Sequence, residues 1–443
     1  MEAFHDGRGL ALTAANPQAV EAFEHALEAL LGAWGGVDRH VDEALLRDPH
    51  FVLARCIRIA VRLLRGDIEA ATADADFLAD ELPAYASDRE RRHVLALQAW
   101  LAGRRRQASR HYDDLLARYP LDILALHVAL ALDFRIGSRP ALRDRVVRVL
   151  PHWRSDTMHY GYLNGMHAFG LEENGEYAEA AVVAHRSLAM IPDNAAAMHV
   201  IAHVFEMQGR AADGIRFLEQ TRPTWSANPG FAAHIAWHLA LFHVDRGSAG
   251  DALAIHDRML RPSRSSTVAA LVDASALLWR LELRGASVGR RFGVVARGWR
   301  RQSLRRLRAF DLIHAMVAFV GAGRRRAASH LVEMLRADPV TRAASEPDEI
   351  ALAIPFCEAL QAFAREDYRI AVEKIAAVRE QTARCGGSVA QCDLVHLTLL
   401  EAALRGRRAR LAQALAAERS ARRPASLLNR WLFRRAGAMQ PTG

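Results

Sequence analysis

The sequence predicts an all-α fold, built from one continuous stack of antiparallel helix pairs. Helical stretches of about 12 to 18 residues alternate with short breaks at Gly, Pro or Asp. Runs of alternating β-branched residues joined by hairpin turns are rare. A motif also recurs along the chain at a spacing of 34 to 38 residues, which is the spacing of helical-repeat proteins.

The recurring motif is a Gly, an Ala five residues later and a Pro twelve residues after that. It occurs as Gly66, Ala71 and Pro83, as Gly103, Ala108 and Pro120, and as Gly175, Ala180 and Pro192. Weaker copies start at Gly209, Gly247 and Gly323. Gly permits a tight turn between two helices, Ala lets the helices approach closely, and Pro ends the second helix. The segments Asp122 to Gly137 and Thr267 to Gly285 lack the motif, and we expect them to be helices of the same array.

This motif resembles the tetratricopeptide repeat, a helix pair of about 34 residues. The resemblance implies an α-solenoid, a right-handed superhelix of antiparallel helix pairs. One helix pair cannot bury its own apolar face, so we expect a single array over residues 1–443. Within it we distinguish N-terminal repeats (1–157), His-rich central repeats (158–262) and Arg-rich C-terminal repeats (263–443), which should close or cap the array.

Longer segments resemble the tetratricopeptide repeat protein 38 family. They are GLALTAANPQAVEAFEHAL, MHYGYLNGMHAFGLEENGEYAEAA, MHVIAHVFEMQGRAADGIRFLE and HIAWHLALFHVDRG, within residues 8 to 260. The resemblance implies a fold and carries no reaction with it.

Composition and charge limit the classes of function. Hydrophobic residues make up 51% of the 443 residues, which excludes a disordered chain. No membrane span and no secretory signal are visible, so we expect a cytoplasmic protein without a membrane partner. The four cysteines lack metal or redox spacing, and we expect reduced thiols, some of them buried.

The net charge of +9 comes almost entirely from arginine, since Lys374 is the only lysine. The stretch Arg290 to Arg308 is rich in arginine and contains no acid. A solvated helix face or a contact with an acidic partner explains it. We do not expect a nucleic-acid partner, because only Phe292 and Trp299 could stack on bases there.

Histidines gather in the central repeats, where eight of the 20 lie between His159 and His243. In a tetratricopeptide repeat the first helix of each pair lines the concave groove. Counting back from Gly209 puts His199, His203 and Glu206 on that face, and counting back from Gly247 puts His234 and His238 there. Residues at i and i+4 share a helix face, so the two histidine pairs should look at each other across neighbouring helices.

Three interpretations of this cluster remain open. Each histidine could be a structural residue bonded to Glu206, Asp245 or a tyrosine. The cluster could hold a small polar molecule or a peptide. It could also be a metal centre, because two His-x-x-x-His pairs and a carboxylate suit Zn²⁺ or Fe²⁺. Val200 and Ile235 stand where an H-E-x-x-H motif has its glutamate.

Two classes of function therefore compete. The first is a binding module whose concave pocket holds a small-molecule ligand or a peptide, with ligand-binding residues Tyr162, His167, His199, His234 and Trp237. The second is an enzyme with catalytic residues His203, Glu206 and His238, either with a divalent metal on His199, His203, His234 and His238 or by acid–base chemistry alone. The substrate, the reaction and the oligomeric state stay undetermined.

Overall fold

The computed structural model describes residues 4–82, 86–264, 266–337 and 347–440. Over these residues the protein is all-α apart from one short antiparallel hairpin, in which β1 (Phe4–His5) pairs with β2 (Ala11–Leu12). The predicted all-α fold is confirmed, and the hairpin is a feature that the sequence did not indicate. No helix among the described residues is long and apolar enough to cross a membrane.

The chain divides into two compact units. The first comprises residues 1–200 and 227–231, and the second comprises residues 201–226 and 232–443. The boundary falls inside one continuous helix, α11 (Ala195–Met207). The division of the array at residues 157 and 262 stays a prediction.

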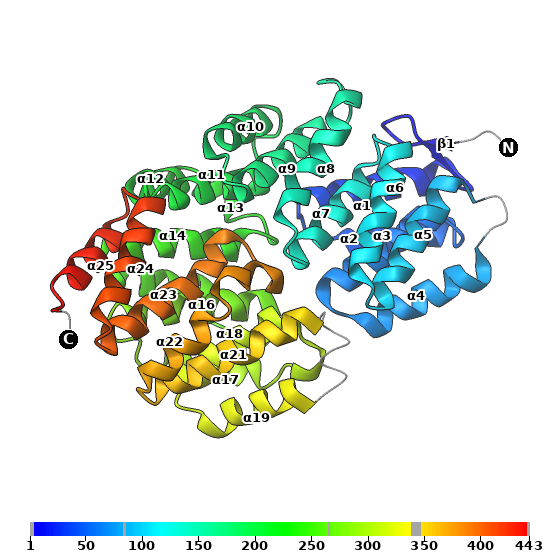
Figure 1. Cartoon of the computed structure of the whole chain (residues 1–443). Helices are drawn as coiled ribbons and strands as arrows, with labels where there is room; N and C mark the ends of the chain where they lie inside the picture. Colours follow the sequence, from blue (N-terminus) through cyan, green and yellow to red (C-terminus); the bar gives the residue numbers. More distant parts are fainter. Residues whose placement is uncertain (1–3, 83–85, 265, 338–346, 441–443) are drawn as a thin grey trace. The chain divides into compact units, whose positions relative to one another are not determined.

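The first unit is built from consecutive helices that pack in order (Figure 1). They are α1 (Pro17–Leu31), α2 (Val37–Arg47), α3 (Val52–Arg65), α4 (Ile68–Glu81), α5 (Asp88–Leu101), α6 (Arg105–Arg118), α7 (Ile123–Arg135), α8 (Arg139–Val149), α9 (Tyr160–Glu173) and α10 (Tyr177–Met190), with a 3-10 turn at Leu150–His152.

The second unit is also built from packed helices. Its helices are α12 (Ala211–Gln220), α13 (Arg222–Trp225), α14 (Ala232–Arg246), α15 (Ala249–Ile255), α16 (Val268–Leu283), α17 (Arg291–Trp299), α18 (Ala309–Gly321), α19 (Arg325–Ala337), α21 (Pro347–Ala364), α22 (Tyr368–Ala376), α23 (Val389–Arg405), α24 (Ala409–Arg422) and α25 (Leu427–Gly437). A π-helical turn (His256–Leu260) and 3-10 turns (Leu304–Arg306, Arg379–Cys385) complete it.

The repeat motif has the structural roles that the sequence predicted. Every motif glycine has a left-handed backbone, for example φ of +84° at Gly175 and +81° at Gly66. The motif alanines Ala71, Ala108 and Ala180 are fully buried. Pro120 and Pro192 follow the ends of α6 and α10, whereas Pro83 lies outside the described residues.

The segments without the motif are also helices. Asp122 caps α7 by accepting from the backbone N–H of Ala125, and Thr267 caps α16 in the same way through Ala270. Close helix contacts explain another glycine outside the motif, Gly170 in α9. A Cβ atom there would lie 2.4 Å from the carbonyl oxygen of Leu142 in α8.

The C-terminal helices of the second unit return to pack on its earlier helices. Helix α23 packs on α16, and α25 packs on α14. The carboxylate of Asp245, at the end of α14, accepts from Ser426 Oγ and from the backbone N–H groups of Leu427 and Leu428. Asp245 therefore anchors the start of α25. Within this unit, α23 and α25 cover α16 and α14.

Candidate metal centre

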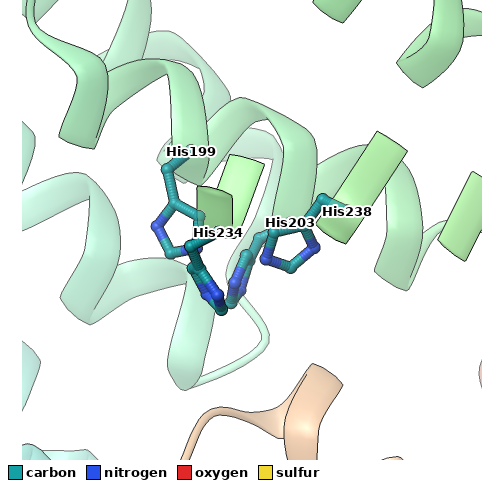
Figure 2. A group of neighbouring side chains, drawn as sticks. All are labelled: His199, His203, His234 and His238. Atoms are coloured by element: carbon teal, nitrogen blue, oxygen red, sulfur yellow. The ribbon is translucent and has the colours of Figure 1, made fainter. Parts of the chain in front are cut away.

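The histidine cluster is built by two helices that each present two imidazoles one turn apart. Helix α11 carries His199 and His203, and α14 carries His234 and His238. One ring nitrogen of each of the four residues lies within 4.8 Å of those of the others. The rings of His203 and His238 have centroids 4.5 Å apart, and those of His234 and His238 are 4.9 Å apart. Figure 2 shows the four side chains gathered in one place.

The cluster is buried. His203 and His238 are fully buried and His199 is 7% exposed, whereas the side chain of His234 is 23% exposed. Helices α11 and α14 are apolar at most of the positions between the histidines, and this explains why both enter the interior. Burying several imidazoles is unfavourable unless hydrogen bonds or an ion compensate for the lost water.

Two buried carboxylates orient two of the rings. His234 Nδ1 lies 2.9 Å from Asp273 Oδ2, and His238 Nδ1 lies 2.8 Å from Glu206 Oε2. An ionised carboxylate only accepts hydrogen bonds, so each ring donates through Nδ1. Nε2 is then the nitrogen that each ring can offer to a ligand. A carboxylate behind a metal-binding histidine is the usual second layer of a metal site.

The electrostatic environment differs along the cluster. Burial lowers the pKa of His238 well below its usual value, and the neighbouring His203 and His234 lower it further. Burial also opposes protonation of His234, but Asp273 outweighs it and raises the pKa of that ring. Burial raises the pKa of Glu206, against the effect of Arg423. His238 is therefore neutral near pH 7, as a metal ligand must be.

Trp237 packs against the cluster. Its indole stacks on His234 with the rings 5.3 Å apart and 11° from parallel, and it meets His238 edge-on at 4.8 Å. The guanidinium of Arg280 lies over the same indole, 5.4 Å from its centroid.

A layer of charged residues from the C-terminal helices surrounds Glu206. Arg423 Nη1 lies 3.8 Å from Glu206 Oε1 and 3.8 Å from Asp393 Oδ2. Asp393 is held by Arg419 through two hydrogen bonds of 2.7 and 3.1 Å. These side chains line a small cavity of about 40 Å³ next to Glu206. His203, His234 and His238 belong to the second unit, and His203 and His238 are fully buried.

Two of the predicted ligand-binding residues make their contacts within the first unit. Tyr162 is buried and donates through its hydroxyl to Glu28 at 2.7 Å. His167 lies on α9 near Glu176 and Glu179, and burial lowers its pKa. Their role in ligand binding stays a prediction.

Sequence reasoning missed Asp273 and Arg280. Both lie on α16, which has no repeat motif. Groove-facing residues were found by counting back from a motif glycine, so this count did not reach either residue. A signal was present, because each is an isolated charge in the apolar helix VAALVDASALLWRLEL. Buried charges need partners, so these two positions could have been marked.

No family model matches this chain. Among solved structures, it is similar to the human IFIT1 dimer with m7Gppp-AAAA, at 13% identity and a TM-score of 0.44 over 96% of this chain and 95% of that one. It is also similar to a monomeric mutant of IFIT1 with Gppp-AAAA, at 14% identity and a TM-score of 0.43 over 97% and 96% of the two chains. Over the described residues the chain is an all-α protein whose consecutive helices pack on one another.

Proposed function

We propose that this helical-repeat protein binds a divalent transition-metal ion at the histidine cluster. His203, His234 and His238 are the central ligands, and His199 offers a fourth imidazole from the preceding turn of α11. The observation that carries the proposal is the pair of hydrogen bonds from Nδ1 of His234 and His238 to buried carboxylates, which direct both Nε2 atoms to a ligand.

The donor set favours Zn²⁺ over Fe²⁺. Imidazole nitrogen suits both ions, but non-haem Fe²⁺ sites usually include a carboxylate ligand. Within the group of four histidines, Glu206 and Asp273 accept from the rings, so this group offers only nitrogens. A tetrahedral zinc ion with bonds of about 2.0 to 2.1 Å separates its ligands by about 3.4 Å. The nitrogens lie within 4.8 Å of one another, so binding requires the rings to close by about 1.4 Å or less.

This proposal changes the role that the sequence suggested for Glu206. A carboxylate that accepts from His238 Nδ1 at 2.8 Å orients that ring and supports its neutral form. Glu206 then acts as a positioning residue, not as the acid–base group of an enzyme. A bound zinc ion would supply Lewis acidity and could activate water, so an enzyme using this centre remains the alternative proposal.

Enclosure of the cluster favours a small ligand over a peptide. His203 and His238 are 0% exposed, and a peptide would have to displace the C-terminal helices to reach them. We therefore propose a metal ion together with a small molecule, in a cytoplasmic member of the tetratricopeptide repeat protein 38 family. The resemblance of the quoted segments supports that family.

The test is the metal content of the purified, untagged protein, measured by inductively coupled plasma mass spectrometry before and after reconstitution with Zn²⁺ or Fe²⁺. We expect close to one ion per chain. The double variant His203→Ala/His238→Ala should lose the ion and keep its helical circular dichroism.

The matched control is His314→Ala, which removes a buried histidine of α18 outside the cluster and should keep the ion. Absence of metal after reconstitution would contradict the proposal. Unfolding of the double variant, with no metal in the wild type, would indicate that the histidines are structural.

A further inference from the structure

Trp237 differs from other buried tryptophans of this protein. The indole N–H groups of Trp153, Trp225, Trp279 and Trp299 each donate to an oxygen, at 2.7 to 2.9 Å. Trp237 is 0% exposed, and its Nε1 has no hydrogen-bond partner among the described residues. An unsatisfied buried donor is unfavourable, so a position of this kind calls for an acceptor.

The position of this indole connects it to the candidate metal centre. It stacks on His234 and meets His238 edge-on. A ligand bound to an ion on these two imidazoles would therefore lie beside the indole. Neither ring accepts a hydrogen bond from Trp237 Nε1, which has no acceptor among the described residues.

The charge of Arg280 beside the indole favours an anion as that ligand. Arg280 carries a positive charge and is 4% exposed, and its hydrogen bonds in the described structure go to the backbone carbonyls of Ala276, Ala390 and Gln391. No ion pair of Arg280 occurs within the described part of the chain. Burial lowers the pKa of Arg280 despite the nearby Asp393 and Glu206, consistent with an undercompensated cation.

We propose that the centre binds a small monoanion, such as a carboxylate, which coordinates the ion and accepts a hydrogen bond from Trp237 Nε1. This inference rests on the proposed metal centre and names the class of its second ligand. Arg280 contributes by its charge and by its position over the indole, since a cation on the ring face makes the N–H a stronger donor. Trp237 is a specificity residue for the anion and is not required for the ion.

The experiment uses the full chain loaded with Co²⁺, whose visible absorption reports the geometry of the site. Sodium azide, and then sodium acetate, is titrated into the wild type and into Trp237→Phe. Phe keeps the aromatic stack and removes the N–H. We expect the same Co²⁺ affinity and a dissociation constant for azide that is about tenfold higher in the variant. Arg280→Met should weaken azide binding in the same direction.

The matched control is Trp299→Phe, which removes an indole donor bonded to Ser275 at 2.9 Å and should leave azide binding unchanged. Equal azide affinity in the wild type and Trp237→Phe, with full Co²⁺ loading, would overturn this inference and leave the metal centre intact. Failure of the wild type to bind Co²⁺ and Zn²⁺ would overturn the metal centre, and this inference with it.

Discussion

Replacement of Glu206 by Gln tests whether the second layer of the site supports metal binding. Gln has nearly the same shape, and its amide oxygen can still accept from His238 Nδ1, which lies 2.8 Å from the carboxylate. The change removes only the negative charge. Hydrogen bonds to charged groups contribute about 1.5 to 3 kcal/mol, against about 0.5 to 1.5 kcal/mol between neutral groups. The difference, about 1 to 1.5 kcal/mol, corresponds to a roughly tenfold loss of metal affinity.

The assay is a competition titration of Zn²⁺ against a chromophoric chelator at pH 7.5, with Asp273→Asn measured in parallel. We expect each variant to bind Zn²⁺ about 10 to 100 times more weakly, the range typical of second-layer changes. Glu282→Gln is the control, because Glu282 lies on the same helix as Asp273 and makes no contact with the cluster histidines in the described structure. If Glu206→Gln binds zinc as the wild type does, the argument from the oriented rings is refuted.

Three further predictions concern stability. Gly170→Ala should lower the melting temperature more than Gly250→Ala, because a Cβ at Gly170 meets backbone 2.4 Å away, whereas one at Gly250 meets nothing within 4 Å. Similar losses in the two variants would contradict this account. Asp245→Ala should lower the free energy of unfolding by about 1 to 2 kcal/mol and speed hydrogen exchange at the start of α25. Unchanged exchange there would contradict the role of Asp245 in holding the first turn of α25. His314 has its pKa lowered to about 4 by burial, so the unfolded chain binds a proton more readily between pH 6.5 and 4 and stability falls as the pH falls through this window. Urea unfolding should show that the free energy of unfolding falls by about 2 kcal/mol less in His314→Phe than in the wild type between pH 7.5 and pH 5.0. Equal decreases in the two proteins would refute the assignment of this pH dependence to His314.

The repeat architecture could be predicted because it depends on local rules. A left-handed turn favours Gly, and a close helix contact requires Ala; both appear at a fixed spacing, as at Gly175 and Ala180. The position of the two histidine pairs on one face could be predicted by counting residues back from the turn glycines, since a helix places residues i and i+4 on the same face. The N-terminal hairpin could not be predicted, because it has only two residues in each strand. Asp6 holds it through buried ion pairs with Arg8 and Arg89 that no local pattern indicates.

The enclosure of the histidines was harder to foresee than their proximity. The sequence indicated residues of a concave face, and such a face is open in a regular solenoid. In the second unit that face is instead occupied by helices distant in sequence, through contacts such as that of Arg280 with the carbonyl of Ala390. These contacts depend on how the array continues over more than a hundred residues, which a repeat count does not determine.

The close packing of the imidazole rings bears on the interpretation of the cluster. In a purely structural cluster, each imidazole would serve as a hydrogen-bonding group. Such a role does not require the rings to lie against one another. Here His234 and His238 already satisfy Nδ1 with carboxylates, yet their rings lie 4.9 Å apart, and His203 lies 4.5 Å from His238. Neutral rings gain little from crowding together, and protonated rings would repel. In the proposed centre, a cation shared by the Nε2 atoms would account for the crowding of the rings and for the two buried carboxylates behind them.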